Sequence, residues 1–288
     1  MCGIVGYVGK GEAVPVLIDG LKRLEYRGYD SAGVAYRNGN GIEIYKAGGK
    51  IRNLESILPK DLRDVHIGLG HTRWATHGAP SDRNAHPHRA GCVAVVHNGI
   101  IENYHDLKAD LSRSGVSFQS ETDTEVIPQL IMKYLNGKGD VREAIGKALS
   151  KLKGSYALGI LCESSGQTIF AARKGSPLVI GLGEGECFFA SDIPAILPHT
   201  RKVIFLEDDE LCAVRADGID IENLRTGRKE PVDGRITEIT WTASMTEKEG
   251  FEHFMLKEIF EQPRAVMDTF GEWMEKPERL LDELGLDV

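Results

Sequence analysis

Apolar residues follow two different periods along roughly the first 235 positions. Residues 2–9 (CGIVGYVG) form a short apolar run typical of a buried strand, and residues 13–28 carry apolar side chains at helical spacing, with Gly28 as a stop signal. Residues 31–49 contain two strand patterns around an Asn-Gly turn, which predicts a hairpin. Further strands are predicted at residues 65–72, 92–99, 155–163, 167–175, 177–183, 187–192, 202–216 and 218–224.

Two amphipathic helices are predicted between these strands, over residues 122–135 and 141–152. Strands without regular crossover helices favour antiparallel pairing, so the pattern predicts an α+β layered domain and fits a parallel doubly wound fold poorly. After about Arg235 the sequence becomes polar and irregular, and it turns helical over residues 252–270. We therefore expect a domain over residues 1–235 and a linker over residues 236–262.

Composition and charge narrow the classes of function. The chain has 288 residues, 41% hydrophobic and 27% charged, which is ordinary for a globular protein, and its net charge of -8 disfavours nucleic acid as a partner. It contains neither a basic segment leading into an apolar stretch nor an apolar window of about 18 residues, so we expect a cytoplasmic protein without membrane spans. The five cysteines include no C-x-x-C pair and are expected to be reduced thiols.

Cys2 stands directly behind the initiator methionine. Removal of Met1 would give this residue a free α-amine beside its thiol, and such an amine can act as the base of its own nucleophile. A buried structural cysteine in an N-terminal strand is the alternative. The position alone leaves both interpretations open.

Three further polar stretches interrupt apolar surroundings: residues 71–78 (HTRWATHG), 97–103 (HNGIIEN) and 121–125 (ETDTE). The planar guanidinium of Arg73 is suited to a carboxylate ligand, although it could also cap a strand end or pair with a structural acid. Asn98 and Gly99 are predicted at a strand-to-helix turn, where an amide and a backbone N–H can hold an oxyanion or simply form an Asn-Gly turn. Asp123 is either a helix N-cap or a ligand for an ammonium group.

Two other patterns are ambiguous. His71, His77, His86 and His88 lie close together in the sequence, but their spacing matches no metal motif and no cysteine or carboxylate accompanies them. We therefore expect no metal and no other cofactor.

Residues 181–186 (GLGEGE) resemble a phosphate loop only superficially, because no helix clearly follows and the acids would repel phosphate. A hairpin turn is favoured there.

Taken in order, the segments MCGI, EYRGYDSAG, HTRWATHG, HNGIIEN and ETDTE resemble the glutaminase domain of class II amidotransferases, which are N-terminal-nucleophile hydrolases. The resemblance extends from Cys2 to about residue 263. It implies a four-layer α/β/β/α sandwich of largely antiparallel sheets, with L-glutamine as substrate. The products would be glutamate and ammonia.

The resemblance also implies a role for each matching residue. Cys2 would attack the glutamine amide, Asn98 and Gly99 would hold the oxyanion, and Arg73 and Asp123 would bind the α-carboxylate and the α-ammonium. Thr76 and His77 would line the same pocket. Trp74 would gate the passage of ammonia, and Arg27 would support the terminus of the nucleophile.

The amino-acid sequences of these motifs most resemble those of family members that deliver ammonia to fructose 6-phosphate and make glucosamine 6-phosphate. A sugar-isomerase domain, in cis or in trans, would then be a partner, and residues 263–288 would be its start or remnant. The alternatives are the glutaminase domain of a phosphoribosyl amidotransferase and a catalytically idle domain that binds glutamine for regulation. A homodimer is possible in either case.

Overall fold

The computed structural model describes residues 2–39, 41–135, 139–240, 251 and 254–275. The chain divides into two compact units, Met1–Thr240 and Trp241–Val288, and each is described by itself. Among the described residues, fifteen strands form two sheets, and every neighbouring pair within a sheet is antiparallel.

The first sheet has the strand order β15-β11-β9-β10-β1-β4-β2-β3. Its strands in chain order are β1 (Gly3–Gly9), β2 (Ser31–Asn38), β3 (Gly41–Gly48), β4 (Ile67–Arg73), β9 (Val179–Leu182), β10 (Glu186–Ala190), β11 (Lys202–Phe205) and β15 (Thr237–Glu238). Strand β1 is buried along its whole length, and it lies between β4 and β10 because its apolar run has no polar face to turn toward solvent.

The second sheet has the order β14-β13-β12-β8-β7-β6-β5. Its strands are β5 (His88–Ala90), β6 (Val93–Ile101), β7 (Gly154–Cys162), β8 (Ile169–Lys174), β12 (Glu210–Arg215), β13 (Gly218–Asn223) and β14 (Arg228–Glu230). Strands β6 and β7 pair over nine residues, from Val93 opposite Cys162 to Ile101 opposite Gly154. Along this pairing Asn98 is half-buried, Gly99 and Ile100 are exposed, and Ile101 is buried again.

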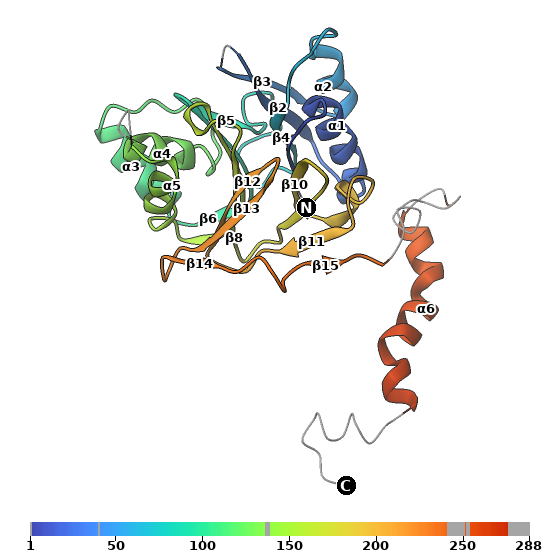
Figure 1. The fold of residues 1–288 in the computed structure, drawn as a ribbon. Helices are drawn as coiled ribbons and strands as arrows, with labels where there is room; N and C mark the ends of the chain where they lie inside the picture. Colours follow the sequence, from blue (N-terminus) through green and yellow to red (C-terminus); the bar gives the residue numbers. More distant parts are fainter. Residues whose placement is uncertain (1, 40, 136–138, 241–250, 252–253, 276–288) are drawn as a thin grey trace. The chain divides into compact units, whose positions relative to one another are not determined.

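Helices cover the outer face of each sheet, so the first unit has four layers (Figure 1). Helices α1 (Ala13–Arg23) and α2 (Ile51–Ile57) pack on the first sheet, while α3 (Tyr104–Arg113), α4 (Val126–Leu135) and α5 (Val141–Leu149) lie beside the second. Three short 3₁₀ turns complete the set: Glu25–Arg27, Glu163–Ser165 and Ile193–Ala195. The α/β/β/α sandwich expected from the sequence is confirmed.

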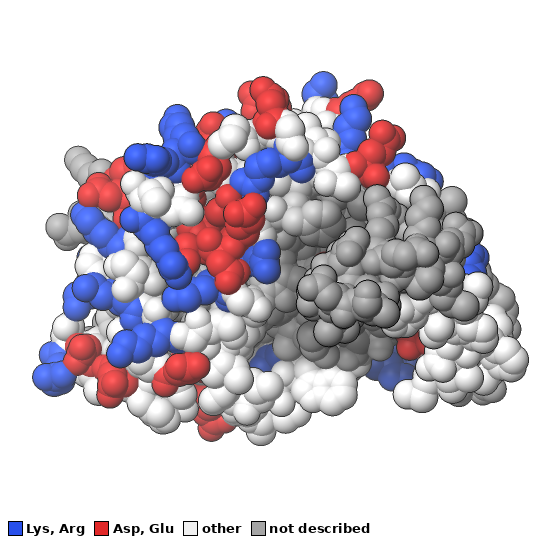
Figure 2. Space-filling model, turned by 90° about the horizontal axis from the view of Figure 1, so that it is seen from below, with Lys and Arg blue, Asp and Glu red and all other residues white. Residues whose placement is uncertain are grey.

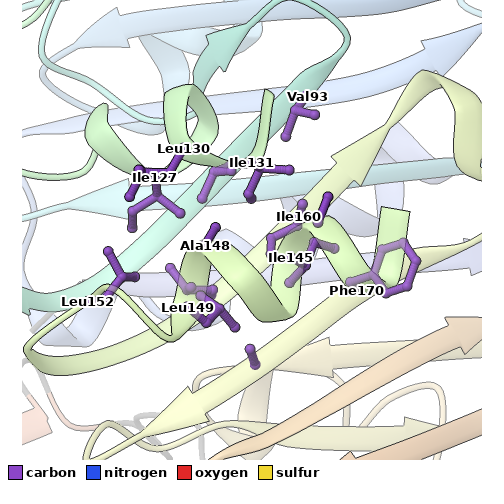
Figure 3. Packing of buried hydrophobic residues seen from close by; sticks show 14 of the residues in the cluster. Val93, Ile127, Leu130, Ile131, Ile145, Ala148, Leu149, Leu152, Ile160 and Phe170 are labelled. Carbon is purple, nitrogen blue, oxygen red and sulfur yellow. The ribbon is translucent and has the colours of Figure 1, made fainter. Parts of the chain in front are cut away.

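Two apolar clusters hold the layers together. One lies between the two sheets and includes Ile4, Val96 and Phe189, all fully buried. The other joins helices α4 and α5 to the second sheet, and Figure 3 shows Ile127, Ile131 and other buried residues of this cluster between helix and strands. Burial of this apolar surface is the main favourable contribution to the stability of the unit.

The structure refines three local predictions. The helix predicted over residues 13–28 ends at Arg23, and a 3₁₀ turn carries the chain to Gly28, whose φ of 74° needs a glycine. Strand β6 runs through Asn98 and Gly99 to Ile101, so the strand-to-helix turn expected at these residues was wrong. The GLGEGE segment is a hairpin between β9 and β10, as predicted.

In the second unit, helix α6 (Phe254–Glu275) agrees with the helical pattern of residues 252–270 and runs across position 263, where an isomerase remnant is expected to start. Its described apolar side chains are exposed: Met255, Leu256, Ile259, Phe260, Val266, Met267 and Phe270. None of the helices formed by described residues has the length and apolar character needed to cross a membrane. The division into glutaminase domain, linker and isomerase remnant stays a prediction.

Candidate active site

One cavity of about 290 Å³ gathers nearly all candidate residues from the sequence. Its lining comprises Cys2, Arg73, Trp74, Thr76, His77, His86, His97, Asn98, Gly99, Ile100, Thr122, Asp123, Thr124, Ser155, Ser176 and Pro177. The side chain of Arg27, the remaining candidate, lies outside the described part of the structure. The cavity lies at the lower end of the range for small-molecule sites, ~300–1,000 Å³.

Cys2 lies at this cavity because it directly precedes β1, which pairs with β4. Its Sγ accepts a hydrogen bond from the backbone N–H of Trp74, just beyond the end of β4, at 3.1 Å. Burial raises the pKa of the Cys2 thiol above its ordinary value, and the Trp74 N–H opposes this rise only in part. The thiol is therefore protonated at neutral pH and needs a base before it can react.

Asn98 and Gly99 lie beside Cys2 at the far end of β6. The Asn98 Nδ2 donates to the backbone carbonyl of Cys2 at 2.9 Å. Gly99 has a φ of 132°, and a Cβ at this position would lie 2.1 Å from the Ser155 carbonyl on the paired strand. Only glycine fits here, so the backbone beside Asn98 takes a course that no other residue could follow.

Arg73, the last residue of β4, is 4% exposed. Its Nη2 donates to the backbone carbonyls of His77 and of Gly78, the latter at 2.9 Å, so it fixes the following loop. Its Nη1 is buried and has no hydrogen-bond partner among the described residues. A buried, unpaired guanidinium donor at a cavity is costly unless a ligand accepts from it, and a carboxylate is the best acceptor.

Asp123 brings a negative charge to the same cavity and is 4% exposed. One carboxylate oxygen accepts from the Ile101 backbone N–H at 2.8 Å. Helix α4 begins at Val126, and the carboxylate contacts strand β6 instead. The structure therefore does not favour the interpretation of Asp123 as a helix N-cap.

The loop after β4 supplies the remaining candidates. Trp74 is 54% exposed, and its ring lies over Gly28, where an added Cβ would come within 2.4 Å of it. Thr76 is exposed, and its Oγ1 lies 3.4 Å from His77 Nδ1. The His77 ring meets Tyr104 edge-on, with 5.5 Å between ring centroids. These residues form the outer wall of the cavity.

His86, His97 and Thr124 also line the cavity but were not assigned to it from the sequence, where His86 was considered only as a metal ligand. His97 Nδ1 lies 2.9 Å from Thr124 Oγ1, and the backbone N–H of His97 donates to His86 Nδ1 at 3.3 Å. Burial lowers the pKa of both histidines, so they are neutral at physiological pH. Their burial inside β6 and its neighbours could not be inferred from sequence spacing.

Among the described residues, no three His, Cys, Asp or Glu side chains form a cluster that could hold a metal ion. The rings of His71 and His86 stack at a centroid distance of 4.3 Å, and those of His86 and His88 meet at 4.8 Å. His77 lies instead in the loop wall of the cavity. The four histidines considered as metal ligands are thus divided between core and loop.

Three features point to the class of the protein: a thiol near the N-terminus, a four-layer antiparallel sandwich and an amide beside the thiol. Residues 71–198 match the family of glutamine amidotransferase domains. This segment contains Arg73, Asn98, Gly99 and Asp123. Residues 71–198 are therefore identified as part of a glutamine amidotransferase domain, and the four-layer fold of the first unit agrees with it.

Two similar curated proteins carry the same name. Glutamine–fructose-6-phosphate aminotransferase [isomerizing] of Caldanaerobacter subterraneus is 50% identical over 289 residues, which cover 99% of this chain and 47% of that protein. The protein of the same name from Symbiobacterium thermophilum is 51% identical over 292 residues, covering 100% of this chain and 47% of the relative. The chain thus spans about half the length of the curated relatives that it matches.

Solved structures agree on the fold. Glutamine phosphoribosylpyrophosphate amidotransferase from B. subtilis superposes with a TM-score of 0.66 and 28% identity, over 77% of this chain and 49% of that one. A glutamine aminotransferase class-II domain protein from Silicibacter pomeroyi has a TM-score of 0.54 and 18% identity, over 77% of this chain and 99% of its own. The second likeness concerns the fold alone.

Proposed function

We propose that the chain hydrolyses the side-chain amide of L-glutamine to glutamate and ammonia at the cavity around Cys2. One observation carries the proposal: the Cys2 thiol, the unpartnered Nη1 of Arg73 and the Asp123 carboxylate belong to one cavity of about 290 Å³. These groups complement the amide, the α-carboxylate and the α-ammonium of glutamine. No cofactor is needed for this chemistry.

The nucleophile depends on removal of Met1. The freed α-amine of Cys2 has an ordinary pKa of about 8, so a substantial fraction is neutral at physiological pH and can take the thiol proton. This base is required because burial raises the pKa of the thiol. The sulfur then attacks the amide carbon, and the amine returns the proton to the departing ammonia.

The negative charge on the carbonyl oxygen is stabilised by two donors, Asn98 Nδ2 and the Gly99 N–H. In the free protein Asn98 Nδ2 already points at the Cys2 backbone, 2.9 Å from its carbonyl oxygen. Donors fixed before the reaction need no reorganisation, which makes them effective in the transition state. Ammonia leaves a thioester on Cys2, and water hydrolyses the thioester to glutamate.

The remaining cavity residues bind and enclose the substrate. Arg73 holds the α-carboxylate and Asp123 the α-ammonium, while Thr76 and His77 line the same space. Trp74 is exposed at the entrance, a position suited to control of ammonia release. We assign Arg27 the support of the Cys2 terminus.

We further propose fructose 6-phosphate as the ammonia acceptor, bound by a sugar-isomerase domain in cis or in trans, with glucosamine 6-phosphate as product. The relatives that this chain matches over about half of their length are named for fructose 6-phosphate, and this supports the acceptor.

A homodimer is also proposed, by family resemblance. Five unpaired cysteines support a cytoplasmic location, where thiols stay reduced.

Two alanine variants test the glutaminase proposal. Cys2→Ala should abolish glutamate release with little loss of stability, because its side chain is small and partly exposed. Cys92→Ala is the matched control and should keep most of the activity, since Cys92 lies outside the cavity. Glutamate release by Cys2→Ala near the parent rate would disprove the mechanism, and an inactive parent with intact Cys2 would favour an idle glutamine-binding domain.

A further inference from the structure

His71 contacts the far side of the Asn98 amide. His71 Nε2 lies 3.0 Å from Asn98 Oδ1 and 3.0 Å from the backbone carbonyl oxygen of His97. The other end of the same amide, Asn98 Nδ2, lies 2.9 Å from the Cys2 carbonyl oxygen. A continuous chain of hydrogen bonds therefore runs from the core to the nucleophile.

The partners decide where each hydrogen atom lies. A backbone carbonyl only accepts, so the Asn98 end that faces Cys2 must be the NH₂ group, and the end that faces His71 must be the oxygen. His71 Nε2 then faces two acceptors and must carry the proton. His71 Nδ1 is the bare nitrogen, and it is buried without a partner among the described residues.

The surroundings of His71 hold this arrangement. The side chain is fully buried on β4, opposite Ile4 of β1, and its ring stacks on His86 with centroids 4.3 Å apart. Burial lowers the pKa of His71 to about 3, so the ring has a single N–H at neutral pH. A flip of the Asn98 amide would set NH₂ against this N–H and oxygen against the Cys2 carbonyl, two repulsive contacts.

We propose that His71 is a positioning residue that fixes the Asn98 amide with its N–H groups toward the reacting carbonyl of the substrate. The inference rests on the proposed glutaminase function and deepens it. His71 itself does not line the cavity and acts only through Asn98. It is therefore expected to affect the chemical step and to leave glutamine binding alone.

Three variants of His71 test the role. His71→Phe keeps a ring in the core but removes the donor, so kcat should fall by at least about tenfold and by no more than the ~10²–10³ typical when an oxyanion donor itself is removed. The KM for glutamine should stay within about twofold, because binding depends on Arg73 and Asp123. His71→Gln places an amide N–H near the position of Nε2 and should restore kcat to within about threefold of the parent. His71→Asn reaches only the position of Nδ1 and should not.

A double-mutant comparison separates positioning from a general structural role. In an Asn98→Ala background, His71→Phe should lower kcat no further, because the group that it orients is gone. An equal loss in both backgrounds, or equal kcat for the Gln and Asn variants, would overturn the inference while the parent remained an active glutaminase. A parent that releases no glutamate would overturn the proposed function together with this inference.

Discussion

The reactivity of single residues in this protein depends on what lies within a few ångströms of them. The thiols of Cys2, Cys187 and Cys212 all have a pKa raised by burial, yet only Cys2 can have its own α-amine beside it. Cys187 and Cys212 lie in the apolar core between the sheets. The sequence alone could suggest this distinction, because the position behind Met1 depends on chain order and not on folding.

Arg73 offers the sharpest test at the residue scale. Its two roles need a forked group, since Nη2 binds the loop carbonyls while Nη1 stays available. Arg73→Lys keeps the charge but cannot do both, so the KM for glutamine should rise by a free energy of about 1–3 kcal/mol in steady-state assays, with a smaller effect on kcat. Arg142→Lys, in α5 and outside the cavity, is the control and should leave KM unchanged. An unchanged KM for Arg73→Lys would remove Arg73 from substrate binding.

Not all of the cavity could be predicted from residue types. Arg73, Asn98 and Asp123 were identified from motif order, and the structure brings them to one cavity. The contact between His97 and Thr124 joins residues 27 positions apart, and no local pattern predicts which side chains a sheet and a helix will bring together. The free nitrogen of Arg73 was equally unpredictable, because it depends on how the following loop closes.

At the scale of elements, strand β6 determines the geometry of the site. The Asn-Gly pair was predicted as a turn because that dipeptide commonly adopts positive φ angles in turns. Pairing with β7 overrides this local preference and extends the strand to Ile101, with Gly99 opposite Tyr156. Local sequence predicted the strand, but only the long-range partner fixes where the strand ends.

Gly99→Ala tests the need for glycine in β6. An added Cβ would lie 2.1 Å from the Ser155 carbonyl, so the strand must move, and we expect both a large loss of kcat and a lower free energy of unfolding. Gly218→Ala is a matched control, because Gly218 has a φ of 151° and open space around its Cβ position. Denaturant unfolding of both variants measures the difference. Equal stability of the two would mean that the close approach to Ser155 is unimportant.

Four buried histidines, three of them on β4, β5 and β6 and one just before β5, make stability depend on pH. Burial lowers the pKa of His71, His86, His88 and His97, so the unfolded chain binds protons that the folded protein does not. Stability should therefore be greatest above about pH 6.5 and should fall as the pH drops below this value, by up to ~1.4 kcal/mol per pH unit for each histidine. Urea unfolding between pH 7.5 and 5.5 measures this slope.

One variant isolates the contribution of His71 in that measurement. His71→Gln should reduce the pH dependence of stability by about one proton relative to the parent. The same slope for the parent and His71→Gln would show that His71 is protonated in the folded state. Because the two slopes are compared directly, contributions from carboxylates cancel.

At the scale of the whole molecule, the layers were predictable but the strand order was not. Runs of strands around two central helices predicted an α+β layered domain, and the motif resemblance implied the four-layer sandwich. The neighbours of β1 are β4 and β10, which are separated from it by about 60 and 180 residues, and nothing in the local pattern selects them. Such pairings depend on which apolar faces fit together across the whole unit.

The charge of the whole molecule bears on whether it would bind the proposed ammonia acceptor, fructose 6-phosphate. On the face shown in Figure 2, basic and acidic side chains lie beside one another. Ion pairs such as Arg142 with Glu222 and Arg215 with Asp220 join the two signs, and the net charge is -8. An acidic molecule of this kind is not expected to attract a free sugar phosphate strongly.

We therefore expect added fructose 6-phosphate to change neither the rate of ammonia release by this chain nor its products. The proposed contacts for glutamine fill one cavity, and the curated relatives that carry the sugar-phosphate name are about twice as long as the segment matched here. Assays of ammonia and of glucosamine 6-phosphate, with and without the sugar, measure both quantities. Formation of glucosamine 6-phosphate by the chain alone would mean that the sugar site lies within it.

The central claim is that Cys2, freed at the N-terminus, is the nucleophile. The most direct measurement is peptide mass spectrometry after reaction with a glutamine analogue that carries an electrophilic ketone in place of the amide. We predict a single adduct on Cys2, in an N-terminal peptide that lacks Met1, and protection from labelling by excess glutamine. An adduct on another cysteine with Cys2 unmodified, or an adduct on Cys2 in peptides that retain Met1, would contradict the account.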